Sequence, residues 1–131
     1  MSPFLIPRVV SNEAASAISI AWDLQGPTLS VSSACSSGAD AIGLAYQSIT
    51  SGATDMMVAG GVESVVTPLA MAGFGNMRAL ARWQGEPTTA SRPFDAQRCG
   101  FVMAEGAGVL VLEEEQAAAY QEASPSAKAG S

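Results

Sequence analysis

The sequence contains no histidine among its 131 residues. Without an imidazole, the chain cannot supply a histidine general base, a histidine metal ligand or a Ser-His-Asp triad. It also has only two cysteines, Cys35 and Cys99, which are too few for a disulfide framework in a chain of this length. Whatever chemistry the chain performs must therefore proceed without an imidazole of its own.

Charge is scarce as well, and its balance is acidic. Charged residues make up 14% of the chain, whereas a typical soluble domain has about 25%. The net charge of −6 argues against nucleic-acid binding, and the 48% of hydrophobic residues excludes intrinsic disorder. The length allows one domain, whose surface normally needs more charge. We therefore expect that the chain buries a broad face against a partner and is a piece of a larger protein.

Long apolar runs are missing too. No basic stretch followed by an apolar run opens the chain, so no secretory signal is expected. The apolar runs are short and interrupted by glycine, serine or charge, so none is expected to span a bilayer. A reducing, cytoplasmic location is the resulting expectation.

Hydrophobic periodicity predicts an α/β fold. We expect an extended N-terminal arm over residues 1–10, because Pro3 and Pro7 oppose helix formation there. A first helix is predicted to start at Ser11 and to stop at Gly26-Pro27. A strand, a helix and a strand then follow in the order of a parallel βαβ unit, over Thr28–Ser33, Ala39–Ser51 and Asp55–Glu63.

The remaining segments are predicted to be shorter and less regular. They are a short helix after Pro68, a second one over Asn76–Ala81, an irregular stretch over Trp83–Arg98, a strand over Phe101–Leu112 with a glycine bulge near Glu105–Gly108, and a helix from Glu113 to about Gln121. Residues 123–131 are expected to form a disordered tail, which leaves residues 1–122 as the domain.

Cys35 is placed where the predicted strand gives way to a helix, in the string SACSSG (residues 33–38). At such a turn the first N–H groups of the helix point toward the side chain, and with the helix dipole they favour the nucleophilic thiolate. The N–H of Cys35 could also stabilise an oxyanion. The arrangement is similar in shape to the nucleophile elbow of serine hydrolases, although G-x-S-x-G is absent.

The alternative for Cys35 is a small buried apolar residue, which is the commoner use of an isolated cysteine. Cys99 has no helix start beside it and is expected to be structural or incidental.

Three strings carry a family resemblance. They are GPTLSVSSACSSGADAIGLAYQSITSGATDMMVAGG (26–61), GGVESVVTPLAMAGFGNMRALA (60–81) and SRPFDAQRCGFVMAEGAGVLVLEE (91–114). Together they resemble the β-ketoacyl-acyl-carrier-protein synthases, which are condensing enzymes of fatty acid and polyketide synthesis, and most closely the elongating type. The resemblance runs from Ser2 to about Ala119. It implies part of a thiolase-like α-β-α-β-α sandwich with a mixed sheet, taken from the N-terminal half of the enzyme.

The resemblance also implies residue roles. Cys35 matches the cysteine that takes an acyl group from a carrier protein as a thioester, which the enolate of decarboxylated malonyl-carrier protein then attacks. Phe74 matches an aromatic lining the acyl pocket, and Leu5 and Ile6 match an arm that reaches the pocket of the twin subunit. Arg78 matches a position near the carrier-protein docking face. No cofactor and no metal is implied.

Each of these roles has a plainer alternative. Phe74 could be an ordinary core aromatic, Arg78 a solvated surface charge, and Leu5 with Ile6 an apolar arm that packs on its own domain. The strand Thr28–Ser33 matches the edge that pairs across the two-fold axis of a homodimer. Two acidic positions, Asp95 and Glu105, match residues that hold the fold together through hydrogen bonds to backbone and to arginine.

The chain also departs from the family. Cys99 and Ala104 stand where the family usually has an acidic residue and a glycine. The two catalytic histidines and the lysine of the family lie in its second half, beyond this sequence, and about a hundred residues of its first half are absent as well. Because imidazoles stabilise the enolate, we expect no condensation by this chain alone.

Two other interpretations stay open. The chain could be an inactive homologue that acts as a dimerising or carrier-protein-binding module. It could also be a thiolase-type enzyme acting on coenzyme A thioesters, although GFGNMRAL (73–80) and SRPFD (91–95) resemble the carrier-protein-dependent branch.

Overall fold

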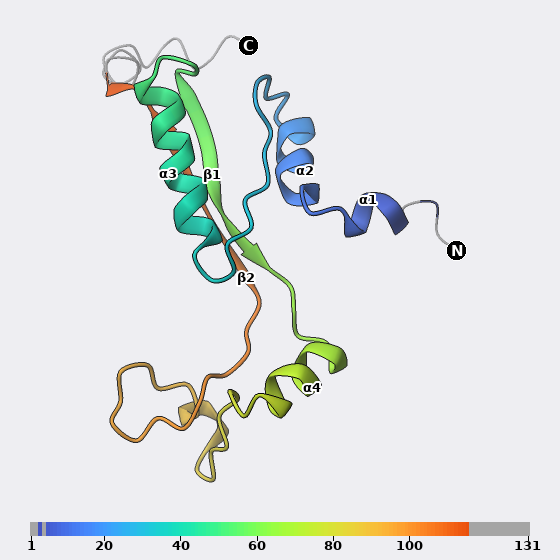
Figure 1. Ribbon diagram of the computed structural model, residues 1–131, viewed down its shortest axis with the longest axis vertical. Helices are drawn as coiled ribbons and strands as arrows, with labels where there is room; N and C mark the ends of the chain where they lie inside the picture. Colours follow the sequence, from blue (N-terminus) through green and yellow to red (C-terminus); the bar gives the residue numbers. More distant parts are fainter. Residues whose placement is uncertain (1–2, 4, 116–131) are drawn as a thin grey trace. The chain divides into compact units, whose positions relative to one another are not determined.

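The structure is a computed structural model, which describes Pro3 and residues 5–115 (Figure 1). The chain divides into two units: unit 2 is Glu63–Ala107, and unit 1 is formed by the segments before and after it. The elements in chain order are α1 (Leu5–Val9), α2 (Glu13–Ala21), α3 (Ser37–Thr50), β1 (Met56–Glu63), α4 (Pro68–Asn76), the 3₁₀ turn η1 (Pro87–Thr89) and β2 (Gly106–Glu113).

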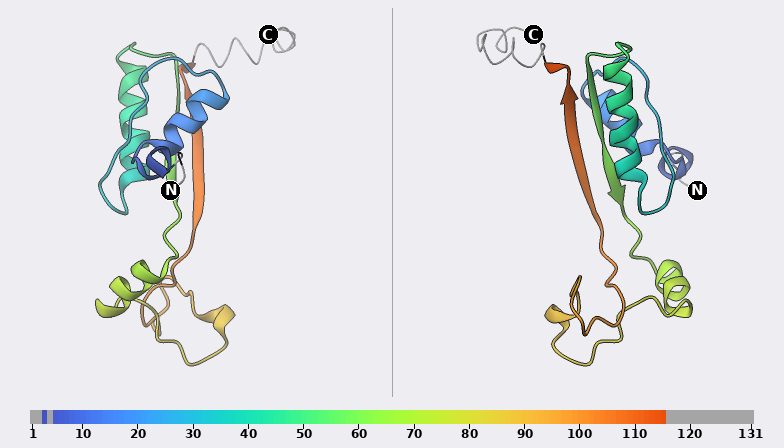
Figure 2. Two further views of the ribbon diagram at one scale, coloured as in Figure 1. Left: turned by 90° about the vertical axis from the view of Figure 1, so that its right-hand side faces the viewer. Right: turned by 60° about the vertical axis from the view of Figure 1, so that its left-hand side comes forward.

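The sheet of the described chain consists of β1 and β2, which run antiparallel (Figure 2). Their backbones approach closely at Gly60, where an added Cβ would lie 2.8 Å from Cα of Val109 and closer still to the Gly108 carbonyl. Only glycine fits such a gap without a shift of the backbone. The predicted strand at Asp55–Glu63 is confirmed, but the parallel βαβ unit is wrong, because the partner of β1 is the later strand β2.

The strand predicted over Thr28–Ser33 is also wrong. The segment has no regular secondary structure apart from an isolated bridge at Ser33. A strand exists only where its backbone pairs with a neighbour, and the described chain places no strand beside this segment. The alternation of Leu29 and Val31 with polar residues therefore indicates an extended conformation without supplying the pairing.

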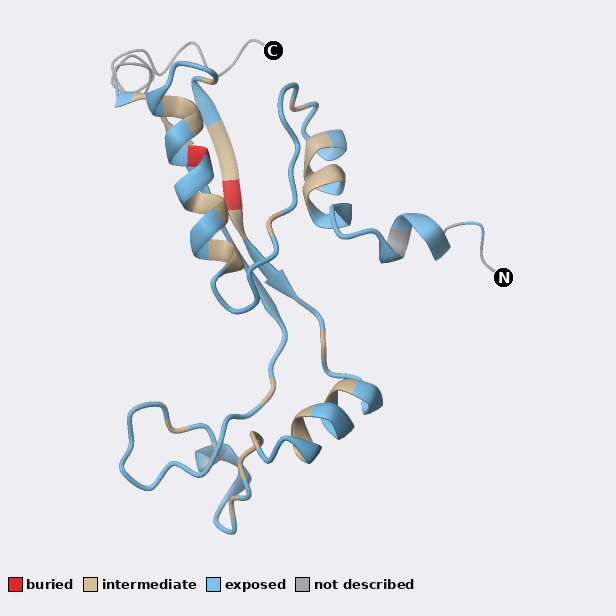
Figure 3. Cartoon of the chain, viewed as in Figure 1, coloured by how far each residue is buried: buried red, intermediate tan, exposed pale blue. Residues whose placement is uncertain are grey.

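The best-packed part of unit 1 lies between α3 and β1, which are side by side in Figures 1 and 2. A Cβ added at Gly61 would lie 3.4 Å from Cα of Gly38, which is an ordinary van der Waals distance, so the start of α3 lies beside the strand at this point. Among the described residues only Ala45 on α3 and Ala59 on β1 are buried (Figure 3). Small residues thus replace large apolar ones at this contact.

The N-terminal segment differs from the predicted extended arm. Residues 5–9 form the short helix α1, and Pro7 is tolerated because it lies in the first turn, where its missing N–H would have no partner anyway. Helix α2 starts at Glu13 with Asn12 as N-cap, one residue later than the predicted Ser11. It ends at Ala21, well before Gly26.

Unit 2 contains α4, whose start follows the expected sequence signals. The side chain of Thr67 accepts a hydrogen bond from the backbone N–H of Ala70 at 3.3 Å, and Pro68 occupies the first helical turn. The helix predicted over Asn76–Ala81 is wrong, because the chain leaves the helical conformation at Arg78, whose φ is +55°. Leu80 instead forms a parallel bridge with Phe101.

The last strand is shorter than predicted. It begins at Gly106, so the strand expected from Phe101 to the bulge is absent, and it extends to Glu113. The helix predicted from Glu113 therefore has its first residue in β2, and its part after Glu115, like the predicted tail 123–131, lies outside the described residues. None of the described helices has the length and hydropathy needed to cross a bilayer.

Candidate functional site

Cys35 lies in an exposed turn directly before α3. The helix begins at Ser37 with Ser36 as its N-cap, and the residue before the cysteine, Ala34, has a φ of +55°. The tight chain reversal requires the left-handed backbone conformation at this position. The turn adopts it although the residue is alanine rather than glycine. The alternative of a buried apolar cysteine is wrong for this structure.

Serine side chains surround the turn and bond to its backbone. The hydroxyl of Ser36 donates to the Ser33 carbonyl at 2.8 Å, and that of Ser37 donates to the Ala34 carbonyl at 2.7 Å. The Ser33 N–H donates to Oγ of Ser37 at 2.9 Å, and the Ser33 hydroxyl donates to Oδ2 of Asp40. The turn that carries Cys35 is thus closed by hydrogen bonds on both sides.

Backbone N–H groups at the start of α3 are only partly available to the cysteine. Those of Ser36 and Ser37 donate to the carbonyls of Ser33 and Ala34, at 3.4 and 3.1 Å. The prediction that the first N–H groups point at the sulfur is therefore wrong for these two. In the described part of the chain no hydrogen bond takes up the N–H groups of Gly38 and Ala39 or reaches Sγ of Cys35.

Asp40 and Ser33 are functional candidates that the sequence prediction missed. A signal was present, because Ser37 and Asp40 have the S-x-x-D spacing of a helix-capping motif. In the structure, however, the carboxylate bonds to Ser33, seven residues earlier. A motif defined by local spacing does not identify such a partner across a turn.

A depression of about 340 Å³ lies along α3. Its lining includes Asp40, Leu44 and Gln47, with Ala39 and Gly43 between them. These residues are spaced along one side of the helix, starting one turn after Ser36. The volume is at the lower end of the range of small-molecule sites.

The predicted pocket residue Phe74 lies in unit 2, in the last turn of α4. It is half-buried, and its ring packs edge-to-face on Phe101 with centroids 5.2 Å apart and an interplanar angle of 84°. Such a pair contributes about 0.5–1.5 kcal/mol beyond area burial. This contact agrees with the alternative of a packing aromatic, and the pocket role stays a prediction.

The other predicted residues are exposed. Arg78 follows α4 in unit 2, while Leu5 and Ile6 begin α1 in unit 1 with exposed fractions of 42% and 67%. An exposed arginine and an exposed apolar pair are compatible with docking and dimer contacts, which stay predictions.

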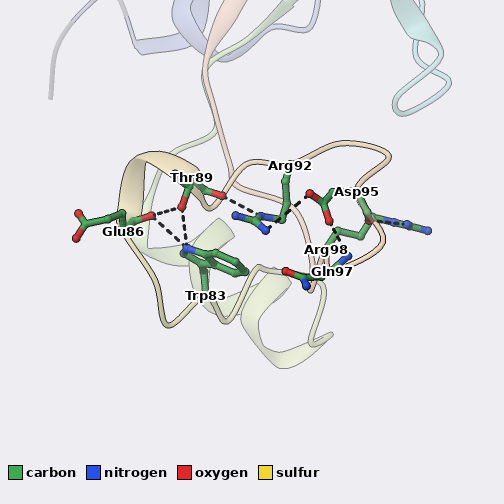
Figure 4. Close-up of polar contacts among 7 residues, drawn as sticks. All are labelled: Trp83, Glu86, Thr89, Arg92, Asp95, Gln97 and Arg98. Carbon is green, nitrogen blue, oxygen red and sulfur yellow. Dashed lines mark hydrogen bonds and ion pairs between the residues drawn. The ribbon is translucent and has the colours of Figure 1, made fainter.

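A polar cluster orders the irregular stretch of unit 2 (Figure 4). The indole N–H of Trp83 donates to the Glu86 carbonyl and to Oγ1 of Thr89, both at 3.1 Å. The Arg92 guanidinium carbon lies 3.5 Å from the centroid of the Trp83 ring, and Nε donates to the Thr89 carbonyl at 3.0 Å. No local sequence pattern indicates this cation–π contact, because its two partners are nine residues apart in an irregular stretch.

Two acidic side chains accept hydrogen bonds from backbone N–H groups in unit 2, as the family resemblance implied. Asp95 accepts from the Gln97 N–H at 2.7 Å and pairs with Arg92 at 3.8 Å. Glu105 accepts from the Val66 N–H at 2.9 Å. These predictions are confirmed. The described residues contain no group of three or more His, Cys, Asp or Glu side chains that could hold a metal ion.

Comparison with protein families defines the class. Residues 1–118 match the family described as "Beta-ketoacyl synthase, N-terminal domain". The match covers most of the chain, and the chain therefore belongs to the β-ketoacyl synthase family. The predicted family is confirmed.

Curated relatives are 3-oxoacyl-[acyl-carrier-protein] synthases. The chain is 48% identical over 114 residues to synthase 2 of Vibrio cholerae, covering 87% of this chain and 28% of the relative. It is 51% identical over 115 residues to synthase 2 of Rhizobium meliloti, covering 87% and 27%. A mitochondrial synthase of Arabidopsis thaliana is 47% identical over 115 residues, covering 87% and 25%. The chain thus spans about a quarter of the length of these relatives.

Solved ketosynthases share the fold. One match is the structure of a type II polyketide-synthase acyl-carrier protein in complex with its ketosynthase. The TM-score is 0.81 at 33% identity, and the match covers 85% of this chain and 28% of the matched chain. A β-ketoacyl synthase from Burkholderia phymatum gives 0.77 at 43% identity, covering 86% and 27%. The described helices and two-stranded antiparallel sheet are therefore a partial ketosynthase fold.

Proposed function

We propose that this chain carries the acyl-accepting site of a β-ketoacyl-acyl-carrier-protein synthase, with Cys35 as the nucleophile. The observation that supports it most is the position of the exposed residue Cys35 on a hydrogen-bonded turn at the start of α3. The neighbouring N–H groups of Gly38 and Ala39 are free of other hydrogen bonds in the described chain and belong to the positive end of the helix.

The proposed step is a transfer between two sulfurs. The Cys35 thiolate attacks the carbonyl carbon of an acyl thioester, a new carbon–sulfur bond forms, and the bond to the carrier's sulfur breaks. The carrier leaves as a thiolate that takes a proton from water. N–H donors near the carbonyl oxygen stabilise the tetrahedral intermediate.

The subsequent condensation needs groups that this chain lacks. Decarboxylation of a malonyl thioester leaves an enolate that requires positioned donors, and the sequence has no imidazole to act as one. The chain alone is therefore acylated without producing a β-ketoacyl product.

The finer assignments are part of the same proposal. Arg78 contributes to docking an acidic carrier protein, and Phe74 with Leu5 and Ile6 contributes to an acyl pocket completed in a homodimer. The complete α-β-α-β-α sandwich with a mixed sheet belongs to the whole enzyme, because the chain covers only 28% of a relative such as the Vibrio cholerae synthase. The pathway served is fatty acid or polyketide synthesis, because a 3-oxoacyl-[acyl-carrier-protein] synthase and a polyketide ketosynthase are both similar to the chain.

The test is acylation by an acyl-carrier protein loaded with a medium-length acyl group, followed by intact mass spectrometry. The chain should gain the mass of one acyl group. Cys35→Ala should abolish the gain, whereas the matched variant Cys99→Ala should keep it. A gain that survives Cys35→Ala would refute the nucleophile, and its absence from the parent chain would refute the proposed function.

A second function is favoured by one observation. Both faces of β2 are exposed, with exposed fractions of 48% for Val109, 54% for Leu110 and 60% for Val111. Apolar strand surfaces of this kind normally meet a partner. A dimerising or carrier-protein-binding module without acyl transfer would show carrier-protein binding that is unchanged by Cys35→Ala and no mass gain.

A further inference from the structure

We propose that Asp40 and Ser33 are positioning residues for Cys35, acting through the hydrogen bond between them. This inference rests on the proposed function of Cys35. It assigns to Asp40 the task of fixing the chain that enters the turn, so that the sulfur stays in one place relative to the start of α3.

The two sides of the turn are held in different ways. On the side that leaves it, Gly38 lies beside Gly61 of β1, where an added Cβ would be in ordinary van der Waals contact at 3.4–3.5 Å from the opposite backbone. The start of α3 is therefore anchored to the sheet by backbone contact.

The side that enters the turn is held by side chains rather than by a strand of the described chain. The Ser30 hydroxyl donates to the Ser11 carbonyl at 2.9 Å. Nearer the cysteine, side chains of α3 bind Ser33. Oγ of Ser37 accepts from the Ser33 N–H at 2.9 Å, and the Asp40 carboxylate accepts from the Ser33 hydroxyl.

The conformation of Ala34 explains why the turn needs these bonds. Its φ of +55° is unfavourable for a residue with a Cβ, so such a conformation persists only where the surroundings hold it. A bond to an ionised acceptor is the stronger kind of hydrogen bond. Asp40 is spaced one turn from Ser36 on α3 and its own N–H donates to the Ser36 carbonyl at 2.9 Å, which fixes the position of the acceptor.

Loss of the bond between Ser33 and Asp40 should affect the rate of acyl transfer rather than the access of reagents to the sulfur of Cys35. Attack on a thioester requires the sulfur and the oxyanion donors in a defined arrangement, and a displacement of about 1 Å can cost about 100-fold in rate. Alkylation by a small reagent needs only an exposed thiol. Loss of the Ser33–Asp40 bond should therefore slow the first reaction much more than the second.

The experiment uses the full chain in a Cys99→Ser background and compares Ser33→Ala, Asp40→Ala and Asp40→Asn. The probes are hexanoyl-N-acetylcysteamine for acylation and iodoacetamide for alkylation, both followed by mass spectrometry. We expect Ser33→Ala and Asp40→Ala to lower the acylation rate about 10- to 100-fold, while alkylation changes by less than about threefold. Asp40→Asn keeps an acceptor oxygen and should restore most of the acylation rate.

Each outcome is decisive. Acylation of the parent with unchanged rates in Ser33→Ala and Asp40→Ala would refute the positioning role and leave the proposed function intact. No acylation of the parent would refute both. Equal losses in acylation and alkylation would show general disorder of the turn and overturn the inference. If Asp40→Ala does not fold, as judged by circular dichroism, Ser33→Ala and Asp40→Asn still carry the comparison.

Discussion

At the scale of single residues, the two cysteines differ in their surroundings although both are exposed. Cys35 precedes a 14-residue helix and is enclosed by serine hydrogen bonds, whereas Cys99 follows the Arg98 turn without a helix start. Exposure therefore does not separate them, and any difference in their reactivity has to come from the backbone dipoles near Cys35.

The prediction at this scale is faster alkylation of Cys35. With iodoacetamide in slight excess, Cys35 should react at least about threefold faster than Cys99, because Cys35 lies beside the positive end of α3 and Cys99 has no helix start beside it. Peptide-level mass spectrometry during the reaction measures both rates in one sample, with Cys99 as internal reference. Equal rates would argue against activation by the helix.

The sequence allowed the helix after Cys35 to be predicted, because a stretch with helical periodicity follows the cysteine. It did not allow Ser33 and Asp40 to be paired. Their contact depends on the sharp reversal at Ala34, and alanine gives no local indication of a left-handed conformation.

At the scale of secondary-structure elements, helix caps and close backbone contacts explain where a helix starts and where the two strands approach each other. Thr67 and Pro68 define the start of α4, and glycine defines where β1 can approach its neighbours. These local signals were predictable. The pairing of β1 with β2 was not, because a pairing between strands about 40 residues apart depends on the whole topology rather than on the sequence of either strand.

The prediction for the sheet concerns Gly60. Gly60→Ala places a methyl group against the Gly108 carbonyl and Val109 of β2, so it should lower the free energy of unfolding by about 1–3 kcal/mol. The matched control is Gly73→Ala in α4, where an added Cβ meets nothing within 4 Å; it should be neutral or stabilising by up to about 1 kcal/mol. Urea unfolding followed by circular dichroism measures both.

Destabilisation of similar size in both variants would contradict the close approach of β1 and β2. A neutral Gly60→Ala would do the same, because a sheet spacing wide enough for the methyl group is incompatible with the structure.

At the scale of the whole molecule, the described residues bury almost no large apolar side chain. The two buried positions are alanines, while Leu29, Ile20 and Trp22 are exposed by 66%, 83% and 76%. Hydrophobic burial is the main favourable term in folding, so we expect these side chains to be covered by a partner or by a longer chain. The low fraction of charged residues leads to the same expectation, although it does not indicate which face is involved.

The prediction for assembly uses Leu29, in the segment 28–33 proposed to meet a second copy. Leu29→Lys should raise the dimer dissociation constant at least about tenfold, because it places a charge in an apolar contact. The matched control, Gln97→Lys, introduces the same charge at an exposed polar site of unit 2 and should have little effect. Sedimentation velocity measures the association, and equal effects of both variants would refute a specific role for this segment.

A separate prediction concerns condensation. Incubation of the chain with acyl- and malonyl-carrier proteins should give no β-ketoacyl product above the blank, because the chain has no histidine. A product detected by mass spectrometry would show that another residue stabilises the enolate.

The most direct test of the account is the position of the acyl group after incubation of the intact chain with acyl-carrier protein. Digestion and peptide mass spectrometry should find a hydroxylamine-labile thioester on the peptide that contains Cys35, with Cys99 unmodified. An acyl group distributed equally between the two cysteines, or found on neither, would contradict the claim that the turn before α3 presents the nucleophile.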